Sequence, residues 1–197
     1  MAKDLDFSKK IKIPKKTNQK ELLSGNDALS LGAIDAGCSY AAIYPMTPIN
    51  SILTDLAKKQ KETGMIIFHP EDEIAGINSA IGASFTGLRS LVATSGGGFS
   101  LMVEGFAMAG ATETPLVVIE GMRTGPSTGM ATWTSQEDLL FLTRAGNGEF
   151  PRVILTPGDP EEAYRLIFTA FNLADIYQLP VIVVTDKHLS ESAFSTK

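Results

Sequence analysis

Short, continuous apolar runs alternate along the chain with longer segments that begin or end at helix-capping residues. Such runs are typical of strands buried on both faces, and their alternation with helices indicates a parallel sheet. The pattern therefore predicts an α/β fold, a doubly wound, mostly parallel sheet with helices on both faces. The expected strands lie at 40–44, 65–68, 91–94, 116–119, 153–155 and 181–185. The expected helices lie at 27–36, 49–62, 71–86, 99–109, 136–142 and 160–177.

Capping residues place the ends of the first two helices. Asn26 is the expected N-cap of the first helix, because an asparagine side chain accepts a hydrogen bond from a first-turn amide. Gly37 follows the expected end of that helix and Gly64 follows the second. Both glycines stand where a left-handed backbone commonly ends a helix, so we expect that conformation at each.

Four of the expected strands are followed by loops with distinctive chemistry. These loops lie at 44–48, 69–73, 95–98 and 121–134. In an open parallel sheet the loops that follow the strands gather at one edge, and ligands bind there. We therefore expect the functional site at this edge of the sheet.

The composition is that of an ordinary globular protein. The 197 residues are 44% apolar and 20% charged, which suits one domain with an extension. No apolar run approaches the roughly 20 residues of a membrane span, and the N-terminus has no secretory h-region. Cys38 is the only cysteine, so an internal disulfide or a cysteine cluster for zinc or iron–sulfur binding cannot form. These features predict a cytoplasmic protein.

Positive charge is concentrated at the N-terminus. Residues 1–20 contain seven lysines and two aspartates, whereas the rest of the chain contains 10 basic and 20 acidic residues. We expect no nucleic-acid binding, because Phe7 is the only aromatic residue in this segment and the acidic body would repel phosphate. The expected division is a basic leader at 1–23, an α/β domain at 24–192 and a tail at 193–197.

Three acidic residues, Glu71, Asp72 and Glu73, precede a helix of small apolar residues. Acids are favoured at a helix start because they face the positive end of the helix dipole, which alone could explain all three. Small residues also allow close packing against a neighbouring helix, and this would hold one carboxylate at a buried reaction centre. Glu73 is the candidate for that catalytic role.

Residues 95–98 read Ser-Gly-Gly-Gly, which resembles a phosphate-binding loop. The lysine-containing P-loop motif is absent, and no Gly-x-Gly-x-x-Gly motif of a dinucleotide site follows the first strand. Two explanations remain open. The glycines allow either a tight turn from strand to helix or a close approach of the backbone to a ligand or partner.

Thr47 and Arg123 are candidates for ligand contacts. Thr47 lies between Pro45 and Pro48, with Met46, and the two prolines fix the backbone so that its hydroxyl points in a defined direction. Arg123 is the only arginine in the four loops, and a guanidinium among glycines and hydroxyls suits a small carboxylate or phosphate. An ion pair with a surface acid is the alternative explanation for Arg123.

Four motifs follow one another along the chain. They are Tyr-Pro-Met-Thr-Pro at 44–48, Glu-Asp-Glu-Ile-Ala at 71–75, Thr-Ser-Gly-Gly-Gly-Phe-Ser-Leu-Met at 94–102 and Arg-Thr-Gly-Pro-Ser-Thr-Gly at 123–129. This series resembles the α subunit of 2-oxoacid:ferredoxin (flavodoxin) oxidoreductases, and more narrowly its thiamine-pyrimidine-binding domain. Segments 149–152 and 185–192 continue the likeness. The resemblance covers about residues 24–192 and implies a thiamine diphosphate-binding fold of the pyrimidine-domain type.

The resemblance implies a role for each candidate residue. In this family a glutamate, matched by Glu73, hydrogen-bonds N1′ of the aminopyrimidine and favours the imino tautomer, whose nitrogen takes the proton from the thiazolium C2. Thr47 would contact the substrate carbonyl or the cofactor, with Pro45 shaping the pocket. Arg123 would bind the carboxylate of a 2-oxoacid, and the hydroxyls of Ser127 and Thr128 would add contacts.

The resemblance also implies that the site is shared between subunits. No Gly-Asp-Gly-x-x-x-x-Asn motif for diphosphate and magnesium is present. Thiamine diphosphate would be shared with a partner β subunit that holds Mg²⁺ and an iron–sulfur cluster, in a hetero-oligomer that is inactive without this partner. The implied reaction is the oxidative decarboxylation of a 2-oxoacid, such as 2-oxoglutarate or pyruvate, to an acyl-CoA. Coenzyme A and a ferredoxin or flavodoxin acceptor would take part.

The sequence departs from the family in two of its motifs. Met46 stands where isoleucine is common, and Gly97 stands where proline is common, which loosens that loop. A family α chain would also continue past Ser192 into another domain. Two alternatives stay open: another thiamine-dependent enzyme subunit, transketolase-like or indolepyruvate-type, or a non-catalytic α/β module for assembly or ligand binding.

Overall fold

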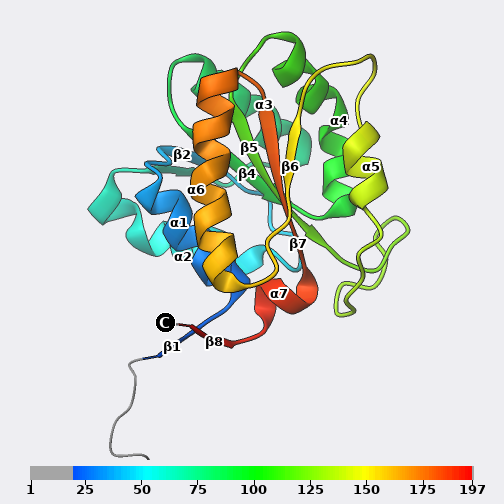
Figure 1. The fold of residues 1–197 in the computed structure, drawn as a ribbon. Helices are drawn as coiled ribbons and strands as arrows, with labels where there is room; N and C mark the ends of the chain where they lie inside the picture. The colour runs from blue at the N-terminus through cyan, green and yellow to red at the C-terminus, as the bar shows by residue number, and fades with distance from the viewer. Residues whose placement is uncertain (1–19, 197) are drawn as a thin grey trace, which may run out of the picture.

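The computed structural model describes residues 20–196. Six strands form one parallel sheet in the order β3-β2-β4-β5-β7-β6, which confirms the predicted α/β class (Figure 1). A separate antiparallel ribbon pairs β1 with β8. The strands are β1 (Glu21–Leu23), β2 (Tyr40–Ala42), β3 (Ile66–Phe68), β4 (Ser90–Thr94), β5 (Leu116–Met122), β6 (Val153–Leu155), β7 (Pro180–Asp186) and β8 (Phe194–Thr196).

Helices cover both faces of the sheet (Figure 1). α1, α2 and α6 pack on one face, and α3, α4 and α5 pack on the other. The helices are α1 (Gly25–Asp35), α2 (Asn50–Thr63), α3 (Glu73–Phe85), α4 (Gly96–Ala111), α5 (Leu139–Arg144), α6 (Pro160–Tyr177) and α7 (Lys187–Glu191).

Alternate residues of the strands enter two separate cores. Val117 and Ile119 of β5 pack beneath α1, α2 and α6, whereas Leu116 and Val118 pack beneath α3, α4 and α5. Each fully buried aliphatic side chain stabilises the fold by about 1.5–3 kcal/mol. All seven residues of β5 are buried, so this central strand is a rigid base for the loop that follows it.

The first helix begins two residues earlier than expected. Its N-cap is Ser24, not Asn26, and Ser24 forms a capping box with Asp27. Asn26 is instead fully buried, and its side-chain amide donates to the carbonyl of Pro48 (2.7 Å) and to the hydroxyl of Ser51 (2.9 Å). The prediction of Asn26 as a cap was wrong because this side chain anchors the loop at 44–48.

Other boundaries follow the expected pattern more closely. Gly37 and Gly64 have the predicted left-handed backbone, and both β6 and α6 match their expected ranges. α4 begins at Gly96 rather than at residue 99, because Ser95 is extended (φ −124°, ψ 175°) and the three glycines form the first helical turn. β5 and β7 both run past their expected ends, and α5 begins three residues later than expected.

Two elements near the C-terminus were not predicted, α7 and β8. β8 pairs with β1, so residues 194–196 of the expected tail lie beside residues 21–23 of the expected leader. The rest of that basic leader, residues 1–19, lies outside the described residues, and the division into leader, domain and tail stays a prediction. Within residues 20–196, no helix has the length and apolar content needed to cross a membrane.

Close packing of α1 on α6 gives a prediction about stability. A Cβ added at Gly32 would lie 2.6 Å from the backbone carbonyl oxygen of Tyr164 and would overlap the side chain of Ile167. We expect Gly32→Ala to lower the free energy of unfolding by about 1–3 kcal/mol, because overpacking outweighs the gain in helix propensity. Gly82→Ala is the matched control, since a Cβ at this exposed position in α3 meets no atom within 4 Å. It should raise the unfolding free energy by about 0.5–1 kcal/mol, and chemical denaturation measures both effects.

Candidate active site

Four loops of distinctive chemistry meet at the carboxyl edge of the parallel sheet, the lower end in Figure 1. They follow β2, β3, β4 and β5. The chain leaves β2 toward the sheet edge at β3 and then returns to β4 on the other side of β2. Ligands bind at such a reversal of strand order, because the loops diverge there and leave a crevice.

Glu73 is buried at the start of α3. Its side chain is only 3% exposed, and no donor among the described residues reaches its Oε1. The N-cap of α3 is Asp72, whose carboxylate accepts a hydrogen bond from the amide of Ala75 (2.7 Å), while Glu71 is exposed. Asp72 therefore fulfils the capping role that could have explained all three acids, and the carboxylate of Glu73 has an acceptor oxygen free for a ligand.

The first turn of α4 packs directly against Glu73. A Cβ at Gly98 would overlap the hydroxyl of Thr94 and lie 2.6 Å from Oε1 of Glu73. A Cβ at the adjacent Gly97 would lie 3.3 Å from the backbone oxygen of Ser127. None of the three glycines has a positive φ, so they are not needed for a turn. They allow close approach, and the neighbours are side chains and backbone of this chain itself.

The loop at 44–48 is held from two sides. The guanidinium of Arg123 donates to the carbonyl of Thr47 (2.8 Å), and Asn26 holds the carbonyl of Pro48. Asn50 donates to the hydroxyl of Thr47 at 3.3 Å. Thr47 is half-buried and Pro45 is exposed. The structure thus brings Arg123 into contact with the backbone of Thr47.

Arg123 is buried, with only 8% of its surface exposed. Its second terminal nitrogen donates to the carbonyl of Thr128 (2.8 Å), so Thr128 contacts Arg123 through its backbone. Among the described residues, Arg123 forms no ion pair with an acid. A cavity of about 210 Å³ lies beside Arg123, and its lining includes Ser127, Ser95 and Asp138.

Two acidic residues near this cavity were missed by the reasoning from sequence. Glu120 on β5 is fully buried, and Asp138 is the N-cap of α5. Burial raises the pKa of the Glu120 carboxyl well above its usual range, and the neighbouring Asp138 raises it further. An acid inside an otherwise apolar run was a visible signal for Glu120, whereas the sequence around Asp138 carried none.

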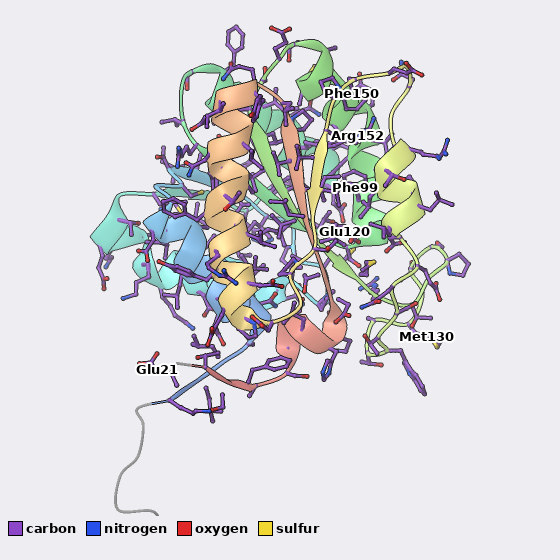
Figure 2. All side chains as sticks on the ribbon, in the orientation of Figure 1. Glu21, Phe99, Glu120, Met130, Phe150 and Arg152 are labelled. Carbon is purple, nitrogen blue, oxygen red and sulfur yellow. The ribbon has the colours of Figure 1, made fainter. Side chains whose placement is uncertain are left out.

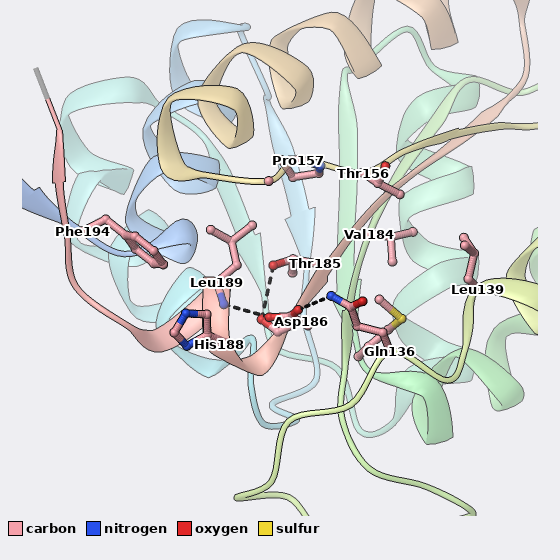
Figure 3. Close-up of a pocket in the computed structure, with 12 residues that line it drawn as sticks. Gln136, Leu139, Thr156, Pro157, Val184, Thr185, Asp186, His188, Leu189 and Phe194 are labelled. Carbon is pink, nitrogen blue, oxygen red and sulfur yellow. Dashed lines mark hydrogen bonds between the residues drawn. The ribbon is translucent and has the colours of Figure 1, made fainter.

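A larger cavity of about 510 Å³ lies at the ends of β5 and β7 (Figure 3). It contains none of the residues predicted for the site. Its most prominent polar group, the Asp186 carboxylate, already accepts hydrogen bonds from the side chain of Gln136 (2.6 Å) and the amide of Leu189 (2.8 Å). We therefore place the candidate site at Glu73 and Arg123 rather than in this cavity.

Metal and thiol chemistry find little support elsewhere in the described part of the chain. It contains no group of three or more histidine, cysteine, aspartate or glutamate side chains suited to a metal ion. Cys38 is buried, and burial raises the pKa of its thiol to about 12. This thiol stays protonated and unreactive at neutral pH.

Comparison with known proteins agrees with the fold and the motifs. The family model described as pyruvate flavodoxin/ferredoxin oxidoreductase, thiamine diphosphate-binding, matches residues 31–196. The chain therefore belongs to this family, and the resemblance inferred from the four motifs is confirmed.

Relatives and a solved structure show how much of a whole subunit the chain covers. It is 42% identical over 194 residues to the α subunit of 2-oxoacid:ferredoxin oxidoreductase 1 of Sulfurisphaera tokodaii, spanning 92% of this chain and 31% of that protein. It is 42% identical over 177 residues to the 2-oxoglutarate synthase subunit KorA of Archaeoglobus fulgidus, spanning 88% and 51%. A 2-oxoglutarate:ferredoxin oxidoreductase from Magnetococcus marinus, solved with 2-oxoglutarate, coenzyme A and succinyl-CoA bound, superposes with a TM-score of 0.89 at 36% identity, covering 94% and 32%. The chain thus spans 31–51% of the length of these relatives.

Proposed function

We propose that this chain is the pyrimidine-binding half of a thiamine diphosphate site in a 2-oxoacid:ferredoxin (flavodoxin) oxidoreductase. With a partner β subunit it would carry out the oxidative decarboxylation of a 2-oxoacid to an acyl-CoA, and alone it would be inactive. The observation that carries this proposal is the buried carboxylate of Glu73, with an unpartnered oxygen, in a chain of this family.

The residues present fit the cofactor. A buried oxygen without a donor is costly unless a ligand supplies one, and a protonated ring nitrogen is such a donor. Glu73 would bind the aminopyrimidine, and Thr47 and Pro45 would border it. When bound, thiamine diphosphate supplies the stabilisation of a carbanion, while the protein positions and activates it.

Glu73 would act by holding a proton at one nitrogen of the aminopyrimidine. Its side chain is almost fully buried, and Gly98 of α4 approaches its carboxylate closely. A hydrogen bond to a carboxylate is stronger in such a dry setting than in water. The packing around Glu73 therefore favours general acid–base catalysis at this residue.

Arg123 would capture the substrate through its carboxylate. A guanidinium has five N–H donors, and two of its terminal nitrogens already hold the carbonyls of Thr47 and Thr128. The remaining donors and the full positive charge are free for an anion in the cavity beside Ser127. The fixed position of the guanidinium lowers the entropy lost on binding, with the hydroxyls of Ser127 and Thr128 as further contacts.

The partner subunit would supply the rest of the site. The Sulfurisphaera tokodaii relative is named as an α subunit, and the sequence here has neither the diphosphate and magnesium motif nor a cysteine cluster. We assign Mg²⁺, the iron–sulfur cluster and the contact with ferredoxin or flavodoxin to the partner. We favour 2-oxoglutarate over pyruvate, because several relatives are named for 2-oxoglutarate.

The direct test is 2-oxoacid-dependent reduction of a viologen dye by the chain assembled with its β subunit, thiamine diphosphate and Mg²⁺. We expect no reduction by either subunit alone and turnover by the pair, fastest with 2-oxoglutarate in a panel that includes pyruvate and indolepyruvate. Preference for indolepyruvate would favour a different thiamine-dependent class. No turnover with any 2-oxoacid, in a pair shown to bind thiamine diphosphate, would contradict the proposal.

A further inference from the structure

The loop that carries Arg123 and Ser127 has a carboxylic acid at each of its two stems. Glu120 lies on β5, three residues before Arg123, and Asp138 lies where the chain enters α5. We propose that Glu120 and Asp138 share one proton and so clasp the two stems of the loop, which positions Arg123 for the substrate carboxylate. The positioning rests on the role given to Arg123 under Proposed function.

The burial of Glu120 requires an explanation of this kind. Its side chain is 0% exposed, and no donor among the described residues reaches either of its carboxyl oxygens. Figure 2 shows it in the interior below Phe99, whereas Met130 of the same loop lies at the surface. Asp138 acts on Glu120 through its charge and through a side-chain hydrogen bond, and both raise the pKa of the Glu120 carboxyl. Since two carboxylates can only accept hydrogen bonds, the contact is favourable only when one of them carries a proton.

The surrounding charges favour the shared proton. Burial raises the pKa of Asp138, while the hydrogen bond from Glu120 lowers it and the nearby Glu137 raises it. Arg123 borders the same cavity as Asp138, but its guanidinium donates to backbone carbonyls. Glu73 contacts the first turn of α4 at Gly98, whereas Asp138 contacts it at Gly96. That turn contributes no titratable side chain. Glu120 and Asp138 have no ion-pair partner in the described chain, so one shared proton avoids a buried negative charge on Glu120 beside the half-buried Asp138.

The clasp joins the fully buried Glu120 on one stem to the half-buried Asp138 on the other. The other ties within the loop are more exposed, such as the amide of Gly125 to Glu137 (3.3 Å) and the hydroxyl of Thr124 to the carbonyl of Thr134 (3.4 Å). The carboxylate of Asp138 also packs tightly against the first turn of α4, because a Cβ at Gly96 would overlap it. The first turn of α4 therefore limits the space open to the Asp138 carboxylate, which lines the same cavity as Arg123.

Loss of the shared proton should open the clasp. The folded chain binds this proton more tightly than the unfolded chain, because the pKa of Glu120 is raised in the folded state. The free energy of unfolding should therefore fall as the pH rises from the usual glutamate range through the raised pKa. Repulsion between the two carboxylates would then move the stems apart and displace Arg123. The KM for the 2-oxoacid should rise over the same pH range, with less change in kcat.

The test uses Glu120→Gln in the assembled enzyme, with Glu104→Gln on the exposed face of α4 as the control. The glutamine amide can donate to Asp138 without titrating, so we expect the alkaline rise in KM to disappear in Glu120→Gln and to persist in the control. Glu120→Ala, which cannot form the clasp, should raise KM about tenfold at all pH values. A rise in KM in Glu120→Gln that matches the wild type would overturn the proposal.

A spectroscopic measurement tests the proton without relying on activity. In the full chain with ¹³C-labelled glutamate side chains, the carboxyl resonance lost in Glu120→Gln should titrate well above the usual glutamate range. Titration within that range would refute the shared proton.

Arg123→Lys separates this proposal from the proposed function. An unchanged KM in Arg123→Lys would contradict the role of Arg123 and with it the positioning, whereas the titration of Glu120 is decided independently.

Discussion

Replacing Glu73 by glutamine is expected to lower kcat of the assembled enzyme by about a hundredfold or more. Glutamine keeps the size of the side chain but offers an amide in place of the buried carboxylate, so it cannot hold a proton-bearing nitrogen in the same way. The oxygen concerned is unpartnered and the side chain is only 3% exposed, so solvent cannot substitute for it. Viologen reduction at saturating 2-oxoacid, thiamine diphosphate and Mg²⁺ measures the effect.

Glu71→Gln is the matched control for this variant. It removes the same charge two residues earlier, at an exposed position of the same helix start. If Glu73 were only a first-turn acid, both variants would retain turnover close to the wild type, because Asp72 would still cap α3. Equal activity of the two variants would therefore refute the catalytic role of Glu73.

Replacing Arg123 by alanine is expected to raise the KM for the 2-oxoacid about a hundredfold, with a smaller effect on kcat. The variant removes a buried positive charge and leaves the carbonyls of Thr47 and Thr128 without their donors. Both losses weaken substrate capture, whereas later electron transfer involves a product that has already lost the carboxylate. Initial rates over a range of 2-oxoacid concentrations separate the two parameters.

Arg144→Ala provides the comparison for Arg123→Ala. Arg144 lies in the last turn of α5 and is exposed, so its loss changes the net charge equally without touching the cavity. We expect its KM to stay within about twofold of the wild type. A KM that rises equally in both variants would show that overall charge, not a contact of Arg123, attracts the substrate.

The order of strands and helices could be predicted from the sequence because each element has its own local pattern. α6 matches its expected range, with Asp159 as the N-cap and a proline at its start. The ends of β5 and β7 were placed too early because each strand continues through an acid, Glu120 or Asp186, and acids are usually exposed. Glu120 continues β5 only because α4 and α5 cover it, and this covering is a property of the tertiary structure.

The candidate residues could be selected from the sequence, but their contacts could not. Three adjacent acids at a helix start cannot be told apart by position, and only the fold shows that Asp72 caps the helix while Glu73 is buried. In the same way, the partners of Arg123 are two backbone carbonyls, which carry no mark in a sequence. Asn26 was likewise taken for a helix cap because its hydrogen-bond partner, the carbonyl of Pro48, lies 22 residues away in the sequence.

The most direct test of the central claim is the rate of deuterium exchange at the thiazolium C2 of bound thiamine diphosphate, measured by NMR after acid quench. This exchange reports activation of the cofactor without substrate, coenzyme A or an electron acceptor. The account predicts rapid exchange in the wild-type complex and a rate lower by about a hundredfold or more in Glu73→Gln. Equal exchange rates in the two complexes, with equal occupancy by thiamine diphosphate, would contradict it.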